Sequence, residues 1–105
     1  MRDITAPDLQ LRLNQPDAPL LLDVREPHEY AYASITDSRN IPMNSVPSQL
    51  DQLDAEREIV VICHHGIRSR RVGEYLENQG YPNIINLTGG IDAWAAQVDQ
   101  AMPRY

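Results

Sequence analysis

The chain has 105 residues, enough for one domain with a hydrophobic core and too few for two. Its formal net charge is -6, and all nine basic residues are arginines. This acidic balance argues against nucleic acid or an anionic membrane surface as the main partner.

Helices and strands are predicted to alternate along the chain. The first half contains a helix capped by Thr5 and Asp8, a strand at 20–24, a short helix at 27–32, and a helical segment with Val46, Leu50 and Leu53. The second half contains a strand at 59–63, a helix ended by Gly80 and Pro82, a strand at 84–87, and a helix after Gly89 and Gly90. Residues 59–62 are four branched apolar residues in a row, which is typical of a strand buried on both faces. The alternation predicts a single α/β domain over residues 1–105, with a mostly parallel central sheet and helices on both faces. Trp94 is expected in the core.

The single cysteine, Cys63, excludes an internal disulfide and a multi-cysteine metal site. Residues 1–7 lack the apolar core of a secretory signal, and no run approaches the roughly 18 apolar residues of a membrane span. We therefore expect a cytoplasmic protein, not bound to a membrane, with a monomer as the simplest state.

Cys63 ends the predicted central strand, and a short loop with Gly66 leads from it into a helix. In parallel sheets, ligands bind at the carboxyl ends of the strands, where loop and helix N–H groups form an anion cradle. That field favours the thiolate of Cys63, and Gly66 permits the tight turn such a cradle needs. The segment therefore predicts a site built on a reactive sulfur.

Three arginines, Arg68, Arg70 and Arg71, crowd the first turn of this helix, where the dipole prefers acidic side chains. Their presence indicates that an anion binds there. The alternative is that they are solvated and paired with surface acids, and for Arg70 and Arg71 we prefer this alternative.

His64 and His65, next to Cys63, suggest a metal site. However, adjacent residues rarely converge on one ion and no second ligand cluster is visible, so we expect no metal. They flank the loop entrance or are simply exposed.

Structural roles are expected for Asp23, Arg25 and Glu29. Asp23 lies in an apolar strand and should be paired, and Arg25 is spaced to pair with Glu29. A contact of Arg25 with substrate is the alternative.

Residues 63–69, Cys-His-His-Gly-Ile-Arg-Ser, resemble the C-x-x-G-x-R-S active loop of single-domain rhodaneses. Residues 22–30, 40–42 and 87–94 resemble the family segments L-D-V-R-E-x-x-E-Y, N-I-P and L-x-G-G-x-x-A-W, in family order. Residues 33–38 depart from the usual G-H-I-x-G-A, so a substrate contact from that histidine position is absent.

The resemblance implies a sulfurtransferase in which Cys63 is the catalytic nucleophile and carries sulfur as a persulfide. The implied donor is a small anion such as thiosulfate, and the acceptor is a thiol, cyanide or a protein. The loop amides would hold the outer sulfur, and Arg68 would bind the anionic part of the donor. No metal or other cofactor is required. The implied substrate-binding residues are His64, His65, Gly66, Ile67, Arg68 and Ser69.

Two alternatives stay open. The domain could be a relay module that accepts persulfide sulfur from one protein and delivers it to another through the same cysteine. A cysteine phosphatase or arsenate reductase of similar fold needs an arginine six positions after the cysteine. Here that position is Ser69, and Arg68 comes one residue earlier.

Overall fold

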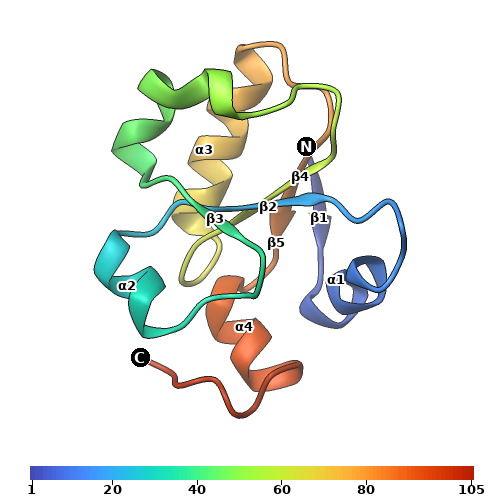
Figure 1. Ribbon diagram of the computed structural model, residues 1–105, viewed down its shortest axis with the longest axis vertical. Helices are drawn as coiled ribbons and strands as arrows, with labels where there is room; N and C mark the ends of the chain where they lie inside the picture. Colours follow the sequence, from blue (N-terminus) through green and yellow to red (C-terminus); the bar gives the residue numbers. More distant parts are fainter.

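A five-stranded parallel sheet with the strand order β1-β5-β4-β2-β3 forms the centre of the computed structural model, which describes residues 1–105 (Figure 1). The elements follow the chain as β1 (Arg2–Ile4), α1 (Ala6–Leu13), β2 (Leu20–Asp23), α2 (Pro27–Tyr32), β3 (Arg39–Asn40), the 3-10 segment η1 (Met43–Gln52), β4 (Ile59–Ile62), α3 (Ile67–Asn78), β5 (Ile84–Leu87) and α4 (Gly90–Gln97). The predicted α/β class is confirmed, and the sheet is parallel throughout.

The three predicted strands, β2, β4 and β5, form the middle of the sheet, and every residue in them is buried. Their alternate side chains feed two hydrophobic clusters, one on each face. Helices α1 and α4 cover the first cluster, and α3 with η1 covers the second; α1 and α3 lie on opposite sides of the sheet in Figure 1. Trp94 is 7% exposed and belongs to the first cluster, as predicted. No helix combines the length and apolar character needed to cross a bilayer.

The structure differs from the sequence prediction mainly at the sheet edges. Strands β1 and β3 were not predicted, because they are three and two residues long and mostly exposed. Residues 43–52 form a 3-10 segment with Pro47 inside it and a break at Gln49, since proline has no N–H for an α-helical bond. One hydrogen bond of the predicted Thr5–Asp8 cap is present: Thr5 Oγ1 accepts from the backbone N–H of Asp8 at 3.3 Å.

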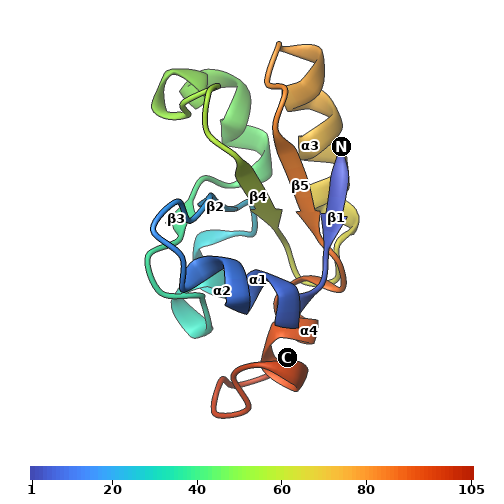
Figure 2. The same cartoon turned by 90° about the vertical axis from the view of Figure 1, so that its right-hand side faces the viewer.

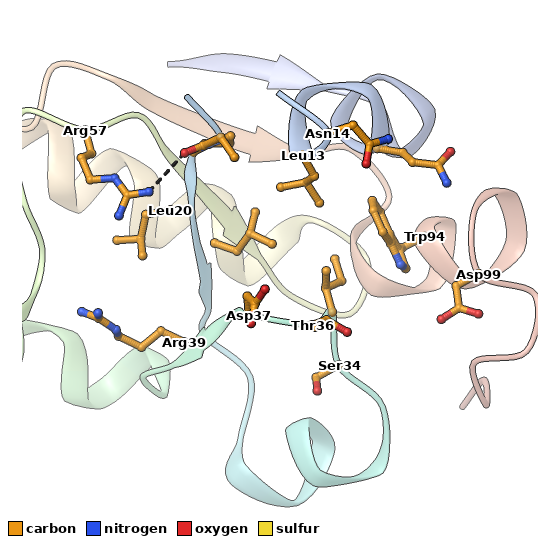
Figure 3. Close-up of a pocket in the computed structure, with 15 residues that line it drawn as sticks. Leu13, Asn14, Leu20, Ser34, Thr36, Asp37, Arg39, Arg57, Trp94 and Asp99 are labelled. Carbon is orange, nitrogen blue, oxygen red and sulfur yellow. Dashed lines mark hydrogen bonds between the residues drawn. The ribbon is translucent and has the colours of Figure 1, made fainter. Parts of the chain in front are cut away.

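The strands β4 and β5 run toward the end of the sheet where α4 begins (Figure 2). Their carboxyl ends therefore lie at the edge where the Cys63 loop and the amino terminus of α4 meet. A separate hollow of about 660 Å³ lies between α1, β2 and the segment before β3. Figure 3 shows Arg39 and Arg57 at one end of it and Asn14 and Asp99 at the other. Its lining includes no residue of the loop 63–69, so it is distinct from the cysteine site.

Candidate active site

Cys63 directly follows β4, and the loop after it turns back onto its sulfur. The backbone N–H of Gly66 donates to Cys63 Sγ at 3.0 Å, and Ser69 Oγ lies 3.3 Å from the same sulfur. Gly66 caps α3 with a φ of 101°, a conformation that strains any residue with a Cβ. The turn thus aims an amide at the sulfur. Cys63 is only 1% exposed, so the sulfur lies beneath the surface of the site.

A chain of hydrogen bonds continues from the sulfur into β5. Ser69 Oγ donates to Asn86 Oδ1 at 2.5 Å, and Asn86 Nδ2 donates to Asp3 at 3.4 Å. Because the Ser69 hydroxyl proton is used on Asn86, the Cys63 thiol donates to Ser69 in this arrangement. Asn86 was missed from sequence, although a polar residue inside the apolar run 84–87 was a usable signal.

Arg68 leaves the loop and binds Glu29 of α2 through two parallel bonds. Nη1 donates to Oε1 at 2.8 Å and Nη2 to Oε2 at 3.0 Å. The bond to Glu29 is the main reason that the pKa of Arg68 is raised. The guanidinium expected to be available for an anion is therefore already paired with a carboxylate.

Arg25 and Asp23 form a fully buried ion pair beneath α2, with Nη2 of the arginine 2.6 Å from Oδ2 of the aspartate. Asp23 is paired, as its place in an apolar strand required. The expected side-chain pair between Arg25 and Glu29 is not formed, since Arg25 reaches only the Glu29 backbone carbonyl at 3.3 Å. Asp23 lies closer along the chain and is equally buried, so it takes the guanidinium.

Tyr105 packs against this site from the end of the chain. Its ring stacks on His64 with centroids 3.9 Å apart, and His64 stacks in turn on His65 at 4.0 Å. The Tyr105 hydroxyl accepts from Arg25 at 2.8 Å and donates to Glu29 at 2.9 Å. Burial raises the pKa of Tyr105, which keeps that hydroxyl proton in place. No local pattern in the sequence pointed to Tyr105.

The other predicted site residues are spread around the loop. The side chain of Ile67 is 70% exposed, and His64 Nε2 is buried without a hydrogen-bond partner. Arg70 pairs with Asp3 at 2.5 Å, in keeping with the surface pairing preferred for it. No three His, Cys, Asp or Glu side chains are grouped as metal ligands.

The Arg68–Glu29 pair predicts a dependence of stability on acid pH. The bonds from Arg68 are the main cause that lowers the pKa of Glu29 from its ordinary 4.5 to about 2. Because the folded-state pKa is depressed, the pair stabilises the fold fully above pH 4.5, and this contribution is lost as the pH falls toward 2. We expect a loss of about 1 kcal/mol, since solvent screens a partly exposed pair.

Urea unfolding at pH 6 and pH 3 measures this loss. In Glu29→Gln, the fall in unfolding free energy between the two pH values should be smaller by most of that amount, because the loss is complete only near the folded-state pKa of about 2. An identical fall in both proteins would show that the pair does not stabilise the fold.

Comparisons with known proteins identify a family model and relatives that match most of the chain. The family model described as the rhodanese-like domain matches residues 5–97. A sulfurtransferase from Allochromatium vinosum is 37% identical over 95 residues, which cover 90% of this chain and 89% of that protein. The thiosulfate sulfurtransferase GlpE from Actinobacillus pleuropneumoniae is 35% identical over 74 residues, covering 70% of this chain and 68% of the other.

Solved structures give the same result. The crystal structure of a rhodanese-related protein from Thermoplasma volcanium is similar with a TM-score of 0.85 and 37% identity, covering 93% of this chain and 94% of the other. A rhodanese-like domain protein from Staphylococcus aureus is similar with a TM-score of 0.87 and 30% identity, covering 100% and 99% of the two chains.

Proposed function

Since this chain belongs to the rhodanese-like domain family, we propose that it moves sulfane sulfur from a donor to an acceptor through a persulfide on Cys63. Relatives named as sulfurtransferases support sulfurtransferase activity in general. The donor is thiosulfate or a persulfide, and the acceptor is a thiol or cyanide.

The observation that carries the proposal is the amide of Gly66, 3.0 Å from Cys63 Sγ. The left-handed turn at Gly66 aims its N–H group at the sulfur, and such a donor stabilises negative charge on sulfur. The amino terminus of α3 adds its dipole at the same point. These groups place positive partial charge at the point where the persulfide anion would form.

The reaction consists of two displacements. The Cys63 thiolate attacks the outer sulfur of thiosulfate, the S–S bond of the donor breaks, and sulfite leaves with the bonding electron pair. An acceptor thiolate then attacks the outer sulfur of the persulfide, which returns Cys63 to its thiolate. Because Cys63 is 1% exposed, the atoms that cover it must move before either reactant can reach the sulfur.

A persulfide donor carried by another protein, as in the relay alternative, is favoured by one specific contact. Arg68 is bound by Glu29, so the site offers an anionic small donor no free guanidinium. The reaction at Cys63 is the same in both cases, and only the donor differs.

Intact mass spectrometry after incubation with thiosulfate or a small-molecule persulfide tests the proposal. We expect a gain of one sulfur atom on the wild-type protein, removed by a thiol or cyanide, and no gain on Cys63→Ser. Gln79→Ala, at the exposed end of α3, is the control and should gain sulfur normally. Wild-type protein that stays unmodified with every donor would contradict the proposal.

A further inference from the structure

The carboxylate of Glu29 is held by four hydrogen bonds beside Arg68 of the active loop. Its two oxygens accept both bonds of Arg68, and Oε1 also accepts the backbone N–H of Glu26 at 3.0 Å. Oε2 accepts the hydroxyl of Tyr105 at 2.9 Å. The side chain is only 12% exposed. Glu29 is thus a fixed negative charge next to the arginine of the active loop.

The other cations near the site do not compensate for this charge. Arg25 is fully buried and is neutralised by Asp23. Arg70 is paired with Asp3, and Arg71 lines a different hollow with Val46 and Tyr75. A reactant that reaches Cys63 therefore meets a balanced Arg68–Glu29 pair, in a chain whose formal net charge is -6.

We infer that Glu29 is a specificity-determining residue that selects sulfur donors by charge, disfavouring dianions such as thiosulfate relative to monoanionic donors. The inference rests on the proposed function and concerns the donor taken at that same site. A sulfonate placed at Arg68 must either displace Glu29 or lie beside its carboxylate. The attraction by Arg68 and the opposing repulsion by Glu29 both scale with the charge of the donor, so the attraction that Glu29 cancels is larger for a dianion than for a monoanion.

Two donors that differ by one charge isolate this effect. Thiosulfate carries two negative charges, whereas methanethiosulfonate has the same reactive outer sulfur, a single charge and an uncharged sulfonyl group. With either donor, the Cys63 thiolate forms a bond to the outer sulfur and the donor S–S bond breaks. Sulfite or methanesulfinate leaves with the electron pair, so the protein product is the same persulfide.

The test compares second-order rates of persulfide formation for the two donors. In Glu29→Gln, the ratio of the thiosulfate rate to the methanethiosulfonate rate should rise about tenfold over wild type, the factor that corresponds to about 1.4 kcal/mol. Glutamine suits the same capping position, so the helix start is preserved. Glu29→Asp keeps the charge and should keep the low ratio.

Glu74→Gln is the matched control, because it removes one negative charge from an exposed position of α3. It should leave the ratio unchanged. If Glu29→Gln slows both donors equally, Glu29 merely positions Arg68 and the inference is overturned; an unchanged ratio overturns it as well. Failure of the proposed function looks different, since then neither donor forms a persulfide on the wild-type protein.

Discussion

Replacing Asp23 with asparagine is expected to lower the free energy of unfolding by about 3–5 kcal/mol, the cost of leaving one member of a buried ion pair without its partner. Both side chains of the Asp23–Arg25 pair are 0% exposed. Asp23 Oδ1 accepts from Arg25 Nε at 2.9 Å and from the Arg25 backbone N–H at 3.1 Å. An asparagine keeps part of this hydrogen bonding but supplies no negative charge.

The variant cannot escape this cost by deprotonating Arg25, because a guanidinium stays protonated in proteins. In the wild-type protein burial acts most strongly on the pKa of Arg25 and lowers it, but the bonds to Asp23 and Tyr105 outweigh burial, and the pKa is raised overall. Arg25 also donates to the carbonyl of Ala33 at 2.6 Å, which holds the end of α2 against the sheet. The Asp23→Asn protein must therefore bury an uncompensated cation or lose this packing.

Urea unfolding at pH 7 measures the effect, with Asp92→Asn as the control. Asp92 pairs with Arg104 at 3.0 Å, but their side chains are 27% and 55% exposed. The same chemical change there should cost less than about 1 kcal/mol. Equal losses of unfolding free energy in the two variants would show that the contribution of the Asp23–Arg25 pair to stability does not depend on its burial.

The central strands and the active loop were predictable from sequence because their signals are local. The runs at 20–24, 59–63 and 84–87 became β2, β4 and β5, each shorter by at most one residue than expected. The turn at Gly66 also depends only on neighbouring residues. Strands β1 and β3 gave no such signal, since they are short edge strands with exposed side chains.

The electrostatics of the site could not be predicted, because its contacts join distant parts of the chain. Arg68 and Glu29 are 39 residues apart, and Tyr105 and Glu29 are 76 apart. Spacing suggested that Glu29 would pair with Arg25 four residues before it. The order of strands in the sheet brings α2 and the start of α3 to the same edge. There Arg68, and not Arg25, binds the carboxylate of Glu29.

The second large effect is expected at Gly90, where a methyl group would separate the active loop from α4. The N–H groups of Ile91 and Asp92 donate to the carbonyls of Cys63 and His64, at 2.8 and 3.1 Å. A Cβ on Gly90 would lie 2.5 Å from the His64 carbonyl oxygen and closer still to that of Cys63. Both obstacles are backbone atoms, so no side-chain rotation can relieve the clash.

Gly90→Ala should therefore lower the unfolding free energy by about 3 kcal/mol or more and slow persulfide formation, because the loop must move off the amino terminus of α4. Gly80→Ala is the matched control: Gly80 has a φ of 93° but no atom within 4 Å of an added Cβ. It carries the strain of a left-handed alanine alone, about 1 kcal/mol, and should not change the reaction of Cys63. Similar losses in both variants would mean that backbone strain, and not contact between α4 and the loop, limits substitution at Gly90.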